Sequence, residues 1–228
     1  MNKKTFYTVT SLIGITIIYF TVKKFFGKKA QPVGSVLFVG DSITAIESNG
    51  KPVTSTYPNI IKSELSSKGV KVDVVAQGGK RTDWILTNLK EKLKTNKYDR
   101  VYIYGGINDM FSSVSIESAL QNVQKMVDLI KSKGSEPYVI IGYDAKTFMD
   151  ENKLKPTSYV PTKAGMVKLK NRYIEFQNSI PNAIKGATIV GKFNIPSSMT
   201  SDAIHPTPSG QKIIANSLLE DIKKRYVK

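Results

Sequence analysis

The sequence predicts an α/β domain of three layers, in which helices cover both faces of a central parallel sheet of about five strands. Short runs rich in β-branched and aromatic residues alternate with longer stretches of helical period. Successive runs start about 30 to 50 residues apart, the spacing expected when a helix crosses over between parallel strands. The chain has 228 residues, of which 40% are apolar, which suits one domain with a filled core.

The first 29 residues are predicted to be an N-terminal transmembrane anchor with basic flanks. Residues Thr5 to Val22 carry no charge, and this run of 18 lies between MNKK and KKFFGKK. A cleaved signal peptide and a buried core helix are the alternatives, although the run is long for a signal and lysines crowd both of its ends. Residues 30–34, which include Pro32, are interpreted as a linker, and residues 35–228 as the folded domain.

Within that domain, five runs are predicted as strands: Val36 to Val39, Val70 to Val75, Val101 to Tyr104, Tyr138 to Ile141, and Ala187 to Val190. Helices are predicted between them, and two have a clear apolar stripe. The stripes are Ile116, Leu120, Val123, Val127 and Ile130, and then Met166, Leu169, Tyr173, Phe176 and Ile180. Both are interpreted as core faces.

The chain ends in a predicted helix that begins at Pro208, with Thr207 as its N-cap, and that buries Ile214, Leu218 and Ile222. One long stretch, Asp144 to Pro161, has no regular pattern. A loop of that length is interpreted either as a binding loop or as an ordinary surface excursion.

Four of the predicted strands are followed by polar motifs. GDSIT with Ser42 follows the first strand, GGKRT with Gly79 the second, GINDM with Asn108 the third, and DAIHP with Asp202 and His205 comes after the fifth. The carboxyl ends of parallel strands meet at one edge of a sheet, where ligands bind. We therefore expect these residues to share one site.

The residue types suit acyl transfer. A serine hydroxyl becomes a nucleophile when an imidazole accepts its proton, and a third group must hold the imidazole in one tautomer. Ser42, the chain's single histidine His205, and Asp202 fit these roles. The negative charge of the tetrahedral intermediate needs fixed donors, each worth ~3 kcal/mol of barrier. The backbone N–H groups of Ser42 and Gly79 and the side-chain amide of Asn108 are the candidates.

Together the four motifs resemble the SGNH or GDSL hydrolases, over a span from Val36 to the C-terminal helix. The resemblance implies a flavodoxin-like sheet, a Ser42–His205–Asp202 triad, and an oxyanion hole of Ser42, Gly79 and Asn108. It also implies that there is no metal and no organic cofactor. Gly78 is an alternative to Gly79, but the G-x-R-T continuation favours Gly79.

Other classes fit less well. Thr44 stands where the α/β-hydrolase motif G-x-S-x-G has its second glycine, and neither a phosphate-binding loop nor a dinucleotide fingerprint is present. Asp41 and Asp109 lie beside the motif residues and could be mistaken for a metal-binding pair. They are interpreted as acceptors for loop backbone N–H groups, because one histidine and no cysteine offer a transition metal little else.

The predicted function is that of a serine esterase that hydrolyses carboxylic esters through an acyl-enzyme. Its substrates would be O-acetyl groups on a polysaccharide or peptidoglycan, or lipid acyl esters. The alternative is a catalytically silent protein of the same fold that uses a basic surface to hold an anionic polymer. Residues 30–228 carry 28 basic and 18 acidic residues, a net charge of +10, although a solvated lysine-rich face without a partner explains this equally well.

The predicted location is a membrane, through a single N-terminal span. Lys23, Lys24, Lys28 and Lys29 weakly favour a cytoplasmic domain. Exported relatives of such enzymes argue for the other face, and an uncleaved export signal is a further possibility, so the face stays open. No basic stretch interleaved with aromatic residues is present, and no specific nucleic-acid binding is expected.

Overall fold

The computed structural model of the chain describes residues 34–45, 47–48, 51–152, 154, 156, 160, 162–200 and 202–226. The predicted membrane anchor, residues 1–29, and residues 30–33 of the predicted linker lie outside the described residues. Within the described ranges, no helix is both long and apolar enough to cross a bilayer.

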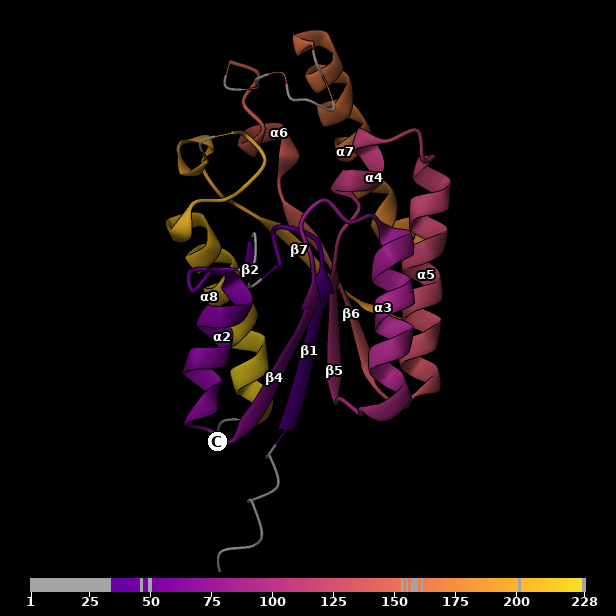
Figure 1. The fold of residues 1–228 in the computed structure, drawn as a ribbon, viewed down its shortest axis with the longest axis vertical. Coiled ribbons are helices and arrows are strands. Elements are labelled where there is room, and N and C mark those ends of the chain that lie inside the picture. Colours follow the sequence, from indigo (N-terminus) through magenta and orange to yellow (C-terminus); the bar gives the residue numbers. More distant parts are fainter. Residues whose placement is uncertain are drawn as a thin grey trace, which may run out of the picture. The chain divides into compact units, whose positions relative to one another are not determined.

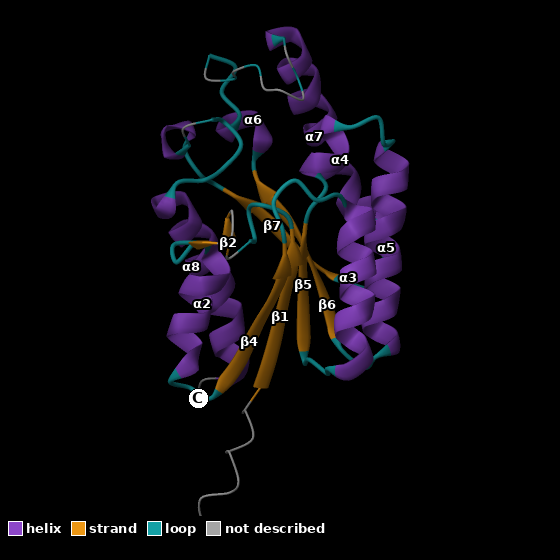
Figure 2. Ribbon diagram, in the orientation of Figure 1, coloured by secondary structure: helices purple, strands orange, loops and turns teal. Residues whose placement is uncertain are grey.

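The centre of the domain is a five-stranded sheet in which every pair of neighbours is parallel (Figure 2). The strand order is β4-β1-β5-β6-β7, which is the flavodoxin-like order. The strands are β1 (Gly34–Gly40), β4 (Val70–Ala76), β5 (Arg100–Tyr104), β6 (Glu136–Tyr143) and β7 (Thr188–Phe193). All five predicted strands are confirmed. Gly34, which the sequence placed in the linker, is the first residue of β1 and pairs with Val70.

Helices cover both faces of the sheet, so the predicted three layers are confirmed (Figure 1). Helices α2 and α8 pack together on one side, while α3, α5 and α7 lie on the other, where α5 contacts both of its neighbours. These helices are α2 (Tyr57–Ser66), α3 (Thr82–Thr95), α5 (Ile116–Ser132), α7 (Lys163–Ala183) and α8 (Pro208–Tyr226). The short elements are β2 (Glu47–Ser48), β3 (Lys51–Pro52), α4 (Ile107–Phe111), α6 (Ala145–Phe148) and η1 (Ser197–Met199).

The apolar stripes lie against the core as predicted, with one difference in α5. Val123, Val127 and Ile130 are buried, whereas Ile116 and Leu120, at the start of that helix, are only partly covered. In α8 the predicted residues Ile214, Leu218 and Ile222 are all buried. That helix begins at Pro208, as predicted.

The stretch from Asp144 to Pro161, predicted to be irregular, contains the short helix α6 at its start. The Asp144 side chain accepts a hydrogen bond from the Lys146 N–H (3.2 Å), which caps the helix. Phe148 is fully buried, and its ring centroid lies 4.0 Å from that of Tyr143. Packing against the core therefore produces a helical turn that is too short for a periodic pattern to reveal. Residues 153, 155, 157–159 and 161 of this stretch lie outside the described residues.

The order of the strands determines where the motifs meet. Strand β1 lies between β4 and β5, so the loops that leave these three strands emerge side by side at the carboxyl edge of the sheet. From β1 the chain continues to β4, its neighbour on one side, and from β4 it crosses to β5 on the other side of β1. In open parallel sheets, the crevice where the strand order reverses in this way is the usual ligand site.

Candidate active site

The segment that follows β1 is a tight turn that presents Ser42. The Asp41 carbonyl accepts hydrogen bonds from the N–H groups of Thr44 (3.1 Å) and Ala45 (2.9 Å). A side chain at Gly40 would place its Cβ 2.4 Å from the carbonyl oxygen of Tyr104 on the neighbouring strand, so only glycine fits there. Ser42 is left half-buried at the edge of the sheet.

Gln211, on the first turn of α8, ties this turn to α2. Its side-chain amide donates to the Ile43 carbonyl (3.2 Å), and its amide oxygen accepts from the Tyr57 N–H (2.9 Å). The Tyr57 hydroxyl is in turn hydrogen-bonded to the Thr44 hydroxyl at 3.0 Å. Sequence reasoning did not find Gln211. The signal that could have revealed it is its position: Gln211 is a polar residue three positions before Ile214, on the buried face of α8.

Ser42, His205 and Asp202 form a chain of hydrogen bonds. Ser42 Oγ lies 2.9 Å from His205 Nε2, and His205 Nδ1 lies 2.6 Å from Asp202 Oδ2. The side chains of His205 and Asp202 are each 48% exposed. The structure therefore brings Ser42 of one motif together with the His205–Asp202 pair of another, in which His205 lies 163 residues further along the chain.

The second carboxylate oxygen of Asp202 organises its own loop. Oδ1 accepts the backbone N–H groups of Ile204 (2.9 Å) and His205 (2.8 Å) and the hydroxyl of Thr200 (3.2 Å). Ala203, which stands between Asp202 and Ile204 in the chain, is buried and has a φ of 63°. An alanine adopts this left-handed conformation only when its surroundings impose it.

These contacts shift both ionisations. Burial by itself raises the pKa of Asp202, but the hydrogen bonds from the His205 side chain and from the loop backbone outweigh burial and hold that pKa well below its usual 3.8. The hydrogen bond to Asp202 raises the pKa of His205 above its usual 6.5, against the opposing effect of burial. The pair thus favours an ionised Asp202 and a more basic imidazole.

The other two motifs lie at the neighbouring strand ends. Gly79, in the loop between β4 and α3, has a φ of 73°, a conformation that favours glycine, and it is exposed. The Asn108 amide donates to the Lys80 carbonyl (3.0 Å), which ties the start of α4 to that loop. Asp109 accepts from the Thr82 N–H (2.9 Å) and hydroxyl (2.6 Å), which confirms its interpretation as an acceptor for loop groups.

A model of the GDSL-like lipase/acylhydrolase family matches residues 38–213, a span that contains all four motifs. The chain belongs to this family. It is therefore an ester hydrolase of the SGNH type, as the motifs predicted. None of the curated protein sequences compared with the hydrolase matches it.

Solved structures of the same fold agree. The chain is similar to a psychrotrophic esterase from Pseudoalteromonas sp. (16% identity, TM-score 0.58), with 84% of this chain and 97% of that one covered. It is similar to a lipolytic protein of the G-D-S-L family from Veillonella parvula DSM 2008 (14% identity, TM-score 0.63), with 84% of this chain and 98% of that one covered. It is also similar to an acetylxylan esterase from Geobacillus stearothermophilus (17% identity, TM-score 0.59), with 88% of this chain and 99% of that one covered. At these identities the likeness establishes the fold.

Asp41 of the hydrolase is a buried carboxyl group with only part of its hydrogen-bonding capacity used. Its Oδ1 accepts from the Ile43 N–H (3.0 Å), as interpreted from the sequence, while Oδ2 has no partner among the described residues. Burial raises the pKa of Asp41 to about 7, although the bond from Ile43 opposes the shift. Asp41 therefore exchanges its proton near neutral pH.

Ser42 and His205 open into a cleft of about 850 Å³. This volume is in the range of small-ligand sites. The apolar residues of its wall include Ala45, Val53, Ala76 and Trp84, and the polar ones include Ser55, Thr56 and Gln77. Sequence reasoning did not find these wall residues, because none of them belongs to the four motifs: they come from the end of β4 and the residue after it, from α3, from the segment before α2, and from the residue after GDSIT.

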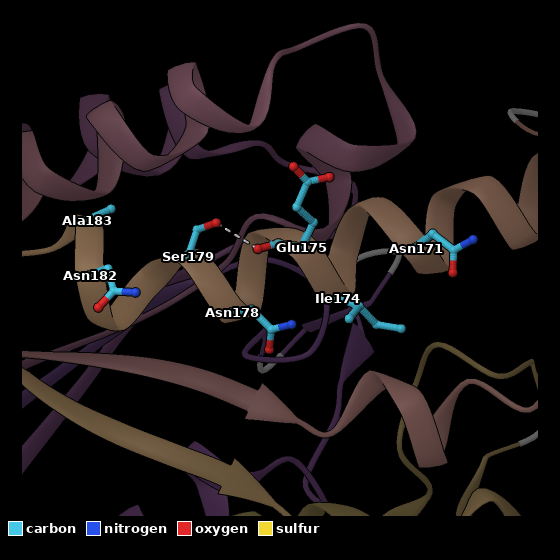
Figure 3. A pocket seen from close by; sticks show the side chains of 7 residues that line it. All are labelled: Asn171, Ile174, Glu175, Asn178, Ser179, Asn182 and Ala183. Atoms are coloured by element: carbon cyan, nitrogen blue, oxygen red, sulfur yellow. Dashed lines mark hydrogen bonds between the residues drawn. The ribbon is translucent and has the colours of Figure 1, made fainter.

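A separate hollow runs along α7, as Figure 3 shows. Its wall is rich in amides, from Asn171, Asn178 and Asn182, and its one hydroxyl, on Ser179, donates to the Glu175 carbonyl at 2.9 Å. The single histidine of the chain is in the other cleft. The Ser179 hydroxyl of the α7 hollow therefore has no imidazole beside it to accept its proton, in contrast to Ser42.

Proposed function

We propose that this hydrolase is a serine esterase that cleaves carboxylic esters through an acyl-enzyme on Ser42. The observation that carries the proposal is the 2.9 Å distance between Ser42 Oγ and His205 Nε2, with Asp202 bound to the opposite nitrogen of the ring. A serine next to a neutral, oriented imidazole is the arrangement that acyl transfer requires.

In the first half-reaction, neutral His205 keeps its proton on Nδ1, and this N–H donates a hydrogen bond to the Asp202 carboxylate. Nε2 is therefore unprotonated and accepts a hydrogen bond from the Ser42 hydroxyl. As Ser42 Oγ attacks the ester carbonyl, its proton passes to Nε2. The imidazolium formed is stabilised by the ionised Asp202 carboxylate. The same proton then moves to the leaving alkoxide, so the alcohol departs and the acyl group stays on Ser42.

The charge of the tetrahedral intermediate needs donors. We assign this role to the backbone N–H groups of Ser42 and Gly79 and to the Asn108 side chain. A carboxamide has two N–H groups. The bond from Asn108 to the Lys80 carbonyl uses one of them and orients the other. Each such donor contributes about 3 kcal/mol to the barrier reduction in other serine hydrolases.

In the second half-reaction, water replaces the alcohol. His205 is half-exposed to the cleft, so water reaches Nε2 once the alcohol has left. The imidazole accepts a proton from water as the water attacks the acyl carbonyl, and it returns that proton to Ser42 Oγ. The products are the acid and free enzyme, and no cofactor takes part. O-acetyl groups on a glycan and lipid acyl esters are the substrates we consider.

The test compares wild type with Ser42→Ala and His205→Ala on p-nitrophenyl acetate and longer-chain esters. Both variants should lose activity by a factor on the order of 10³ or more. Ser217→Ala is the matched control, because Ser217 is exposed on α8 and lines no part of the cleft. Intact-mass measurement during turnover should detect an acyl adduct that Ser42→Ala lacks. Equal rates for wild type and Ser42→Ala would refute the proposal.

We further propose that residues 1–29 hold the enzyme at a membrane, on the support of the uncharged run between two lysine clusters. Expression of the full chain and of a chain that begins at Gln31, followed by membrane fractionation, tests this. Only the full chain should sediment with membranes and resist extraction by salt and alkaline carbonate.

A further inference from the structure

The catalytic cleft adjoins a second hollow, and Trp84 belongs to the walls of both. The second hollow has a volume of about 510 Å³, and its wall also includes Gly79, Lys80, Arg81 and Asp83. A substrate whose ester lies at Ser42 can therefore extend past Trp84 into this hollow. The two spaces together are larger than an acetyl group needs.

Trp84, the chain's single tryptophan, lies in the first turn of α3, where its backbone is hydrogen-bonded. Its backbone N–H donates to the Asp83 carboxylate at 2.7 Å, and its carbonyl accepts from the Asn88 side chain at 2.9 Å. The side chain packs partly against the core and is partly exposed. A partly exposed aromatic ring between two hollows is a flat apolar platform that a planar or ring-shaped group can cover.

The charge around this platform is positive. Arg81 is paired with Asp83 at 2.8 Å, so these two charges largely offset each other. Lys80 has no carboxylate partner among the described residues, and its Nζ lies 5.7 Å from the centre of the Trp84 ring. The hollow thus has one cation that no carboxylate offsets, in cation–π contact with Trp84, within a domain of net charge +10.

The wall of the cleft is suited to a polar group. Gln77 and Ser55 line the cleft, and neither the amide of Gln77 nor the hydroxyl of Ser55 has a hydrogen-bond partner among the described residues. Near Ser42 the wall is built from small residues, Ala45, Ala76 and Gly78. Small and polar walls suit a short acyl group and a hydroxylated alcohol, whereas a long acyl chain needs a continuous apolar channel.

On the basis of the esterase mechanism proposed above, we propose that the Trp84 hollow is a subsite for an acidic sugar, and that the substrate is an O-acetylated, carboxylate-bearing glycan. The sugar ring next to the ester covers Trp84, and the carboxylate of that sugar or of its neighbour pairs with Lys80. Hydroxyl groups of the glycan bond to Gln77 and Ser55. The acetyl group, at the small-walled end of the cleft, is transferred to Ser42.

The experiment measures kcat and KM on three esters: p-nitrophenyl acetate, an acetylated neutral xylo-oligosaccharide, and a partly acetylated oligogalacturonide. Wild type should have the highest kcat/KM on the acidic oligosaccharide. Its advantage over the neutral one should shrink as salt is added, because salt screens the pairing of carboxylate with Lys80. A lysophospholipid and a long-chain p-nitrophenyl ester are run as the lipid alternative.

Trp84→Ala should lower kcat/KM on the acidic oligosaccharide about tenfold relative to kcat/KM on p-nitrophenyl acetate, mainly through KM, because stacking is present in both ground state and transition state. Lys80→Glu should lower the ratio of acidic to neutral oligosaccharide about fivefold or more. Lys90→Glu is the matched control, with the same charge change on α3 outside both hollows. Lys80→Glu also covers the case in which Trp84→Ala fails to fold.

Unchanged ratios in both variants would overturn the subsite while wild type still hydrolyses p-nitrophenyl acetate. A preference of wild type for the lysophospholipid or the long-chain ester would also overturn it and would assign the cleft to lipid. Failure of wild type to exceed Ser42→Ala on every ester would overturn the esterase mechanism, and the subsite with it. The three results are distinguishable, because p-nitrophenyl acetate carries neither a sugar ring nor a carboxylate and so reports the esterase mechanism without the subsite.

Discussion

The turn that carries Ser42 is tied to distant parts of the chain, whereas the loop that carries Asp202 and His205 is held mostly by bonds within itself. Ile43 and Tyr57 are joined through Gln211, which is 168 residues from Ile43. In the other loop, the hydrogen bonds that hold the backbone join near neighbours: Thr207 to Met199 (2.7 Å), and Thr200, Ile204 and His205 to Asp202. Among the described residues of this loop, only the His205 ring forms a hydrogen bond to a distant residue, Ser42. The residues on either side of Ser42 are buried, whereas the side chains of Asp202 and His205 are each about half exposed.

The difference shows two ways of orienting a side chain. The Ser42 turn takes its shape from the whole fold, so a change there should appear as lost stability. The His205 loop takes its shape from one carboxylate, so a change there should appear first as lost activity.

Of the substitutions that test this comparison, Asp202→Asn should have the largest effect, and the effect should be a loss of activity. The amide cannot stabilise the imidazolium that forms when Ser42 attacks, and it allows the wrong tautomer, so kcat should fall by a factor on the order of 10² to 10⁴. Steady-state hydrolysis of p-nitrophenyl acetate measures it. Asp128→Asn is the matched control, an exposed position on α5. A fall of less than about tenfold would mean that Asp202 is not the orienting group.

The pH profile tests the same loop. His205 must be neutral to act as a base, and its pKa is raised above 6.5 by Asp202. In wild type, kcat/KM should therefore rise with pH through a midpoint above 6.5. In Asp202→Asn, the midpoint of the remaining activity should move to lower pH, because the imidazolium of His205 loses the carboxylate that stabilises it and the pKa of His205 falls. If the midpoint does not move, the ionisation that controls kcat/KM is not that of His205.

Asp41→Asn probes the Ser42 turn through the pH dependence of stability. In the folded protein the pKa is about 7 against a usual 3.8, so between these values the unfolded chain has lost a proton that the folded chain keeps. Stability must then fall as pH rises, by up to about 4 kcal/mol. The variant keeps an oxygen for the Ile43 N–H and should lack this slope. Denaturant unfolding of both proteins across this range checks it, and parallel curves would contradict it.

Gln211→Ala tests the long-range tie itself. It leaves the buried Tyr57 N–H and Ile43 carbonyl without partners, at a cost of about 1–3 kcal/mol for each unsatisfied group. We expect a loss of about 2 to 4 kcal/mol in the free energy of unfolding, measured with denaturant, together with a lower rate. Gln121→Ala, at an exposed position on α5, is the control. If Gln211→Ala unfolds like wild type, the turn does not depend on α8.

Thr200→Val should have the smallest effect. It removes one donor from Asp202 Oδ1, which keeps the N–H groups of Ile204 and His205, and it removes the acceptor of the Asp202 N–H (3.3 Å). Valine has nearly the same shape as threonine. We expect about 1 kcal/mol or less in stability, by thermal unfolding, and a modest change in rate. A loss as large as that of Gln211→Ala would erase the distinction between the two regions.

The five strands, the last helix and the order of the motifs were predictable from short stretches, because each depends on local periodicity or on a few adjacent residues. Val36 to Val39 reads as a buried strand on its own, and Thr207 with Pro208 reads as a helix start. Helix α6 was not predictable, since only packing of Phe148 against Tyr143 supports so short a turn. The roles of Ser42, His205 and Asp202 came from the motifs and stay predictions, although the structure places the three side chains in contact.

By itself, the sequence determined the fold class, the family motifs and the chemical types of the candidate site residues, because periodicity and residue type are local properties. The tertiary structure alone decided that Gln211 supports the Ser42 turn, that Asp41 is buried with an unpaired oxygen, and that Trp84 separates two hollows. These depend on contacts between segments far apart in the chain, and such contacts exist only once the sheet has brought its strand ends together.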